Sequence, residues 1–260
     1  MNIIDFHTHP FDHDDCNICR NIPYCRMSAE NTERDLRSLG VTNIAGSVAW
    51  RADSFDEVRK MNDRALRLRD FYRGFYIPGF HVHADFVGES IAEIKRMHSE
   101  GVHLIGEIVP YMHGWSVGYD SPALGEILNV AAEYGMIVSF HGSTEYKEES
   151  VKATDRMVEA HPDITFVGAH VCTDAVLESH ISRLKRYKNY MVDLSGGGIY
   201  RHGVLRHLID ECGMDNILFG SDYPICNPAA YVGGVILDFL ITEEEKQAVM
   251  YDNAKKLLGL

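Results

Sequence analysis

Short apolar runs alternate with amphipathic stretches along nearly the whole chain. The apolar runs have the length of β-strands and begin near Asn2, Thr42, Arg73, Val102, Met136, Ile164, Tyr190 and Asn216. Helical patterns lie between them, at residues 53–71, 86–99, 122–134, 150–160, 174–187 and 204–212. Within residues 86–99, Ile91, Ile94 and Met97 recur at helical spacing with Glu93 off their stripe. The pattern predicts eight strand–helix units.

Eight such units in 260 residues fit one α/β domain, a (β/α)8 TIM barrel over residues 1–260. A doubly wound open sheet is the alternative, but open sheets bind ligands at a single switch point. Here polar residues follow strands one, four, five, six and eight, and only a closed barrel brings those strand ends together. Thr242, followed by Glu243, Glu244 and Glu245, predicts an N-capped helix at the C-terminus.

The polar residues at the strand ends are imidazoles and carboxylates. His7 and His9 close the first run, and because alternate side chains of a strand share a face, they project together. The later runs lead into Glu107, His141, His170 and Asp222. This set of donors suits zinc, manganese or iron. The sequence therefore predicts a metal site at the C-terminal face of the barrel.

Composition narrows the range of partners. The chain is 45% hydrophobic and 24% charged, which is typical of a globular protein. Its net charge of -13 opposes non-specific binding to nucleic acid or to an anionic membrane. No run approaches the roughly 20 apolar residues of a membrane span, and no cleavable apolar leader precedes the first strand. We expect a cytoplasmic protein that acts on a small molecule, without nucleic-acid or membrane partners.

The six cysteines indicate reduced thiols rather than a disulfide scaffold. Cys16, Cys19 and Cys25 form the one cluster among them. A structural zinc site there would need His13 or Cys226 as its fourth ligand. A loop with incidental cysteines is the favoured interpretation, because structural zinc sites usually offer two well-spaced ligand pairs.

The motifs at the strand ends also match a known family. They are Asp5-x-His7-x-His9, Gly106-Glu107, His141, Gly168-x-His170 and Gly220-Ser221-Asp222-Tyr223-Pro224. Through them, and over essentially its whole length, the chain resembles the amidohydrolase superfamily of metal-dependent hydrolases, specifically its small amidohydrolase-related branch.

The resemblance implies roles for these residues. It makes His7, His9, His141 and Asp222 metal ligands, and His170 either a ligand of a second metal or an acid/base group beside the first. Many relatives have a carboxylated lysine where this chain has Glu107, which resembles the TatD-like deoxyribonucleases in which Glu binds or bridges metals. The number of metal ions, one or two, is therefore open, and two ions are slightly favoured. Zn²⁺ is the expected metal, Mn²⁺ and Fe²⁺ are the alternatives, and a homodimer is compatible with the family.

The ligand set itself suggests a reaction. A divalent metal with an open position lowers the pKa of bound water toward about 7 and polarises a carbonyl. Asp222 would take the water proton and pass it to the leaving group, while His170 stabilises the oxyanion or shares in the proton transfer. We predict a hydrolase of a small amide, lactone or ester that carries a carboxylate. The alternative is a metal-dependent non-oxidative decarboxylase of a small carboxylate. A TatD-like phosphodiesterase and a non-catalytic metal-binding barrel are the lesser alternatives.

Three further residues are candidates for binding the substrate. Arg51 ends the second strand, and its guanidinium matches a carboxylate in bidentate fashion; Arg20 and Arg26 offer the same group from the first loop. His81 follows the third strand and either contacts substrate or only lines the rim. Tyr111 lies in the long loop after the fourth strand, where barrel enzymes usually determine their specificity.

Overall fold

A computed structural model describes residues 1–12, 28–142, 147–171, 175–197, 199 and 201–260. Its eight strands are β1 (Ile3–Thr8), β2 (Val41–Ser47), β3 (Tyr76–Phe80), β4 (Leu104–Ile108), β5 (Ile137–His141), β6 (Thr165–Ala169), β7 (Tyr190–Asp193) and β8 (Ile217–Leu218). They pair in parallel in the order of the sequence and make one eight-stranded sheet. The predicted (β/α)8 barrel is confirmed.

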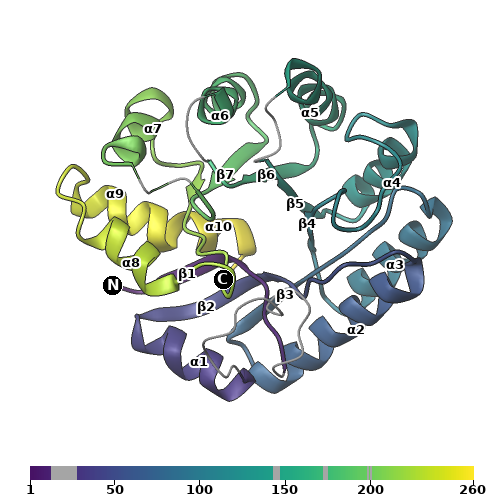
Figure 1. The fold of residues 1–260 in the computed structure, drawn as a ribbon, viewed down its shortest axis with the longest axis horizontal. Coiled ribbons are helices and arrows are strands. Elements are labelled where there is room, and N and C mark those ends of the chain that lie inside the picture. Colours follow the sequence, from purple (N-terminus) through teal and green to yellow (C-terminus); the bar gives the residue numbers. More distant parts are fainter. Residues whose placement is uncertain (13–27, 143–146, 172–174, 198, 200) are drawn as a thin grey trace.

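Helices surround this sheet as an outer ring (Figure 1). They are α1 (Ala29–Ser38), α2 (Phe55–Tyr72), α3 (Val87–Ser99), α4 (Pro122–Glu133), α5 (Glu148–Ala160), α6 (Ala175–Arg186), α7 (Val204–Cys212) and α8 (Pro228–Ile236). The sequence pattern did not indicate α1 or α8, although both start with a capping residue. Ser28 caps α1, and Asn227 caps α8 just before Pro228. Few apolar residues mark the inner face of α1, and α8 is too uniformly apolar to show a stripe.

The barrel closes between β1 and the segment that follows β8. The Phe6 N–H donates to the Phe219 carbonyl at 2.9 Å, and the His9 N–H donates to the Tyr223 carbonyl at 2.7 Å. In the other direction, the Asp222 N–H donates to the His7 carbonyl at 2.8 Å. The ends of the first and last strands therefore lie side by side, which places His7 and His9 next to Asp222.

Two local expectations were wrong. The strand expected near Arg73 begins only at Tyr76, because Arg73 and Gly74 adopt positive φ angles of 39° and 86° and end α2 with a turn. Glu93, expected off the buried stripe of α3, is fully buried. It accepts hydrogen bonds from Asn62 Nδ2 at 2.9 Å and from Arg96 Nε at 2.9 Å, so its burial is matched by polar partners.

The capped helix at the C-terminus is confirmed. Thr242 and Glu245 form a capping box at the start of α9 (Glu243–Gln247). The helix continues through one π-helical turn, η3 (Ala248–Asp252), into α10 (Asn253–Leu258). Asn253 Nδ2 donates to the carbonyls of Met214 and Ile217 at 2.7 and 2.8 Å, which fastens this helix to β8. Among the described helices, none combines the length and apolar character that a membrane span requires.

The buried histidine of α6 predicts a pH-dependent contribution to stability. Burial, with the nearby Arg183 charge, lowers the pKa of His180 to about 3, while the Tyr190 hydroxyl lies 2.8 Å from its Nδ1. A group whose pKa falls on folding contributes stability above its unfolded pKa, here 6.5, and loses it as the pH falls toward 3. Between pH 7 and 5 we expect His180 to account for a loss of about 2 kcal/mol in the free energy of unfolding.

Urea unfolding of the parent protein and of His180→Gln at both pH values measures this contribution. The variant should lose less stability than the parent between pH 7 and 5. Parallel losses in the two proteins would show that His180 is not held neutral in the folded state.

Candidate metal centre

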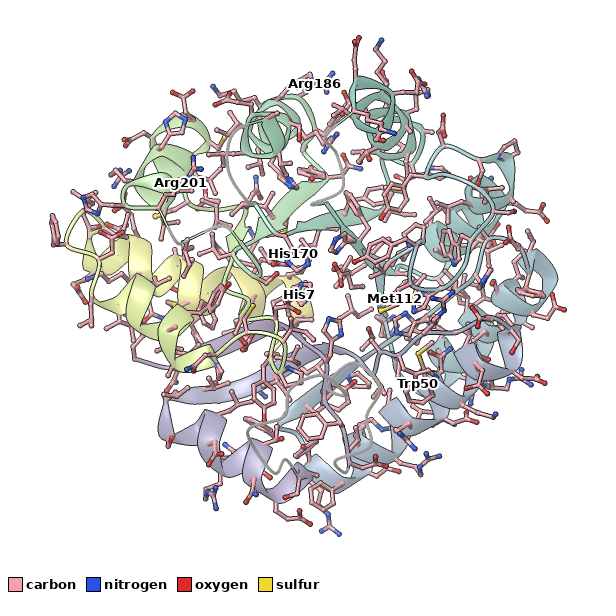
Figure 2. All side chains as sticks on the ribbon, viewed as in Figure 1. His7, Trp50, Met112, His170, Arg186 and Arg201 are labelled. Atoms are coloured by element: carbon pink, nitrogen blue, oxygen red, sulfur yellow. The ribbon has the colours of Figure 1, made fainter. Side chains whose placement is uncertain are left out.

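All six residues predicted as ligands or catalytic groups come together at the mouth of the barrel. His7 and His9 end β1, Glu107 lies in β4 and His141 ends β5. His170 follows β6, and Asp222 follows β8. Figure 2 shows His7 and His170 at the centre of the ring of helices, whereas Arg186 and Arg201 lie out among the helices.

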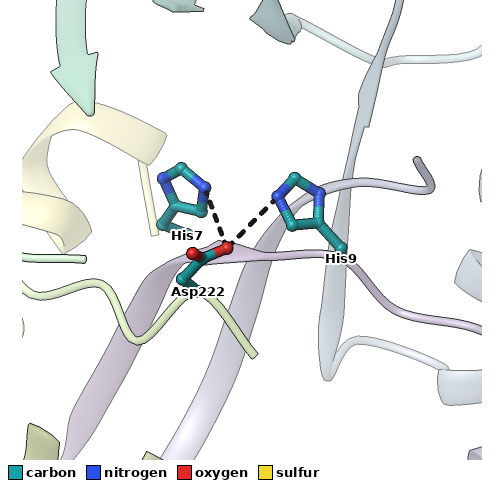
Figure 3. A group of neighbouring side chains, drawn as sticks. All are labelled: His7, His9 and Asp222. Atoms are coloured by element: carbon teal, nitrogen blue, oxygen red, sulfur yellow. Dashed lines mark ion pairs between the residues drawn. The ribbon is translucent and has the colours of Figure 1, made fainter. Parts of the chain in front are cut away.

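The Nε2 atoms of His7 and His9 each face two carboxylates. Asp222 Oδ1 lies 3.8 Å from His7 Nε2 and 3.5 Å from His9 Nε2 (Figure 3). Glu107 Oε2 lies 3.6 Å from each of the same two nitrogens. These separations are too long for hydrogen bonds. Two ligand atoms that each lie about 2.1 Å from a common ion are about 3–3.5 Å apart, so the spacing fits a shared cation.

The other oxygen of Glu107 faces a second pair of histidines. Its Oε1 lies 2.8 Å from His141 Nδ1 and 3.2 Å from His170 Nε2. Two groups of donors in the described part of the chain are close enough to hold an ion: His7 with His9 and Asp222, and His7 with Glu107 and His170. His141 joins them through its hydrogen bond to Glu107 rather than as a member of either group.

The remote nitrogens of the two β1 histidines are held by partners outside the six residues. His7 Nδ1 lies 2.9 Å from Asp193 Oδ2, and His9 Nδ1 lies 2.9 Å from the Ser47 carbonyl. Because both partners only accept hydrogen bonds, each Nδ1 carries the proton and each Nε2 presents its lone pair to the centre. The buried His7 Nε2 has no hydrogen-bond partner among the described atoms. The lone pairs of these Nε2 atoms would repel the carboxylates of Glu107 and Asp222 unless a cation lies between them. The donor set therefore fits a divalent metal.

The charges of the centre shift the pKa values of its members. Burial opposes protonation of His7, but Asp193 and Glu107 outweigh it and hold the His7 pKa well above its usual value. Burial likewise opposes ionisation of Glu107, but His141, His7 and His170 hold its pKa well below the usual value. Glu107 also raises the pKa of His170 against the effect of burial. Protons therefore bind strongly to the histidines, and a metal ion must displace them.

Two of the six residues have an unusual backbone conformation. His170 and Asp222 have φ angles of 64° and 60°, a left-handed region that costs a non-glycine residue about 1–3 kcal/mol. Glycines leave room for two of the histidines: a Cβ at Gly196 would lie 2.4 Å from His170 Nδ1, and one at Gly220 would lie 2.7 Å from His7 Cβ. Strain held at such positions is typical of functional sites.

Asp5 fastens the loop that carries Asp222. Its carboxyl accepts hydrogen bonds from the Ser221 N–H at 2.9 Å and the Ser221 hydroxyl at 2.5 Å. Burial raises the pKa of Asp5 to about 7, against the effect of these hydrogen bonds. The first residue of the Asp5-x-His7-x-His9 motif therefore holds β1 and the Asp222 loop together.

Sequence reasoning missed Asp193 and Ser195. Asp193 ends β7 and Ser195 lies two residues further on, and both are fully buried. The signal that predicted the six clustered residues, a polar residue at the end of an apolar run, is also present at the seventh strand, where Asp193 and Ser195 follow Tyr190, Met191 and Val192.

The predicted substrate-binding residues occupy different environments. Arg51 is 76% exposed and pairs with Asp53 at 3.4 Å. His81 is buried, its Nε2 lies 2.8 Å from the Val48 carbonyl, and burial lowers its pKa to about 4. Tyr111 is exposed, and its ring centroid lies 5.5 Å from that of His141, at the edge of the centre.

The proposed cluster of Cys16, Cys19 and Cys25 falls outside the described residues, as do His13, Arg20 and Arg26. Cys226, the alternative fourth ligand, is partly exposed, and its Sγ lies 4.0 Å from Asp222 Oδ2.

Comparison with known proteins identifies the family. A profile of the amidohydrolase family matches residues 4–260, and the chain belongs to this family. Among curated proteins, none matches the sequence. The structure is similar to 2,6-dihydroxybenzoate decarboxylase from Rhizobium, with a TM-score of 0.76 and 13% identity over 100% of this chain and 99% of that one.

Two other solved structures are comparably similar. For 5-carboxyvanillate decarboxylase from Sphingomonas paucimobilis, the TM-score is 0.73 at 15% identity, covering 100% of this chain and 99% of that one. For a dihydroxybenzoic acid decarboxylase from Polaromonas with bound manganese and 2-nitroresorcinol, it is 0.74 at 13% identity, covering 100% and 98%. At these identities the likeness establishes the fold.

The geometry predicts how metal affinity depends on the β1 histidines. His9→Ala removes one of the four converging donors, and we expect the affinity for Mn²⁺ or Zn²⁺ to fall at least about 100-fold. His207→Ala, which removes a half-exposed histidine of α7, is the matched control and should bind as the parent does. Calorimetric titration of chelator-treated protein measures both. Equal affinities in parent and His9→Ala would contradict the assignment.

Proposed function

We propose that this protein is a metal-dependent enzyme that removes CO2 from a small carboxylate without oxidation. The observation that carries the proposal is an arrangement of four donors: the Nε2 atoms of His7 and His9 face both Glu107 and Asp222, and His170 lies beside Glu107. The similarity of the whole barrel to structures described as decarboxylases supports the choice of reaction. Those proteins act on hydroxylated aromatic carboxylates, which makes that class the first to test.

The four converging donors would hold the metal, and we favour manganese over the zinc expected from the sequence. Manganese is bound in three of the similar decarboxylase structures. When bound, the ion would supply positive charge that holds the oxygen atoms of the anionic substrate in the centre. Arg51, the residue expected to bind the substrate carboxylate, pairs with Asp53 at the surface, so this role would fall to the ion.

His170 is placed to supply the proton that the reaction needs. When the bond between the carboxylate carbon and its neighbour breaks, CO2 leaves and the electron pair stays on the neighbouring carbon. That carbon must then gain a proton. His170 Nε2 faces Glu107 at 3.2 Å, and Glu107 raises the pKa of His170 against burial, which favours the protonated form that can donate. Solvent then returns a proton to His170.

Tyr111 would contact the substrate from the edge of the centre. Burial, followed by the charges of Glu107 and Asp222, raises the pKa of its phenol, so the hydroxyl keeps its proton and remains a hydrogen-bond donor. A donor at this place can bind an oxygen of an anionic substrate.

Hydrolysis of a small amide, lactone or ester remains the second candidate. It is favoured by the presence of two donor groups that share His7, since centres with two ions are common among hydrolases. In that reaction Asp222 would accept the proton of the attacking water and pass it to the leaving group. The phosphodiesterase and non-catalytic alternatives stay untested.

Assays of the manganese-loaded protein distinguish the two reactions. We expect release of CO2 from at least one hydroxylated aromatic carboxylate, and a rate at least about 100-fold lower for His170→Asn and Asp222→Asn, since each loses a group at the reacting atoms. His207→Ala is again the control. Turnover of ester, lactone or amide substrates without any release of CO2 would replace the decarboxylase by the hydrolase.

A further inference from the structure

The buried hydroxyl of Ser195 lies between two histidines of the centre. Its Oγ is 2.9 Å from His170 Nδ1 and 3.1 Å from His7 Nδ1, and it donates a hydrogen bond to Asp193 Oδ1. The Ser195 N–H donates to the same carboxylate oxygen at 2.9 Å. Asp193 and Ser195 are both fully buried, so no solvent competes for these contacts.

The direction of each hydrogen bond follows from the number of hydrogens available. The Asp193 carboxylate only accepts, and the single hydrogen of the Ser195 hydroxyl goes to it. The hydroxyl oxygen must therefore accept from the Nδ1–H of His170. His7 likewise donates from Nδ1 to Asp193 Oδ2 at 2.9 Å. One carboxylate thus orients both rings, and both present Nε2 toward Glu107, at 3.6 and 3.2 Å.

The two histidines differ in how they are held. His7 contacts the Asp193 carboxylate directly, whereas His170 reaches it only through the Ser195 hydroxyl. Loss of the hydroxyl would therefore release His170 and leave the direct bond of His7 in place. Loss of the carboxylate would release both rings.

We propose that Ser195 is the positioning residue of His170: it fixes the ring with a hydrogen at Nδ1, so that Nε2 is the nitrogen presented to the substrate. Asp193 is the anchor that Ser195 shares with the metal-binding histidine His7. The effect on turnover rests on the proposed function, but the state of the His170 ring is a property of the protein without metal or substrate.

Nitrogen NMR of histidine-labelled, metal-free protein, at a pH high enough to leave the His170 ring neutral, tests the state of the ring. We expect a hydrogen on His170 Nδ1 in the parent, with the signal assigned by its loss in His170→Asn. Ser195→Ala should remove this preference, and Ser195→Thr, which keeps a hydroxyl, should retain it. Unchanged His170 nitrogen shifts in Ser195→Ala would overturn the proposal.

Metal titration and kinetics separate positioning from general disruption. Ser195→Ala should keep its Mn²⁺ affinity within about 3-fold of the parent, whereas Asp193→Asn should weaken it about 10–100-fold, as loss of a partner that orients a ligand does. On a substrate that the parent turns over, Ser195→Ala should lower kcat about 10–100-fold with little change in KM, and Ser195→Thr should restore most of it.

Equal losses of metal affinity in Ser195→Ala and Asp193→Asn would make Ser195 a merely structural residue and overturn the proposal. If no carboxylate is turned over by the parent, the decarboxylase proposal fails by itself. The NMR spectra and the metal titrations still decide the role of Ser195 in that case.

Discussion

The buried carboxylate of Glu107 is the charge on which the arrangement of the barrel mouth depends. Ionised carboxylates are rarely buried unless several positive or hydrogen-bonding groups surround them. Here His7 and His9 face one oxygen, and His141 and His170 face the other. Four strands must place their last residues correctly for this to happen. The burial of the Glu107 carboxylate therefore depends on closure of the sheet. Conversely, an open sheet would leave this buried charge without its histidine partners, which is costly.

The junction of β1 and β8 is important for placing these ligands, because it holds the Asp222 loop next to His7. Strand β8 has two residues, so backbone pairing alone gives little hold on the Asp222 loop. The hydrogen bonds from Ser221 to Asp5 and from the Asp222 N–H to the His7 carbonyl supply the rest. They also hold Asp222 in the left-handed region. The strained backbone of Asp222 and the buried carboxyl of Asp5 therefore help to bring the ligand atoms of His7, His9 and Asp222 together.

The sequence was sufficient to predict the barrel and the six clustered residues, because apolar runs mark parallel strands and barrel topology places their C-terminal ends together. What it could not supply were the contacts made by side chains across strands. Glu93 is buried because Asn62 and Arg96 reach it from α2 and from its own helix, and Arg51 turns to Asp53 at the surface. Asp193 looked like any acidic residue at the end of a strand until its distance to His7 was known. Periodicity reports which face a residue occupies, but not which partner it finds there.

The proposed reaction bears on the number of ions at the centre. Asp193, Glu107 and Asp222 bring three carboxylates to it, and Asp5, with a pKa of about 7, is partly neutral. One divalent ion and a proton on His170 would balance three negative charges. A second ion at the group of His7, Glu107 and His170 would displace that proton and remove the acid that the proposed decarboxylation needs. If the protein is a decarboxylase, we therefore expect one ion, with His170 as the proton donor, rather than the two that the sequence slightly favoured; two ions, with His170 as a ligand, would suit hydrolysis.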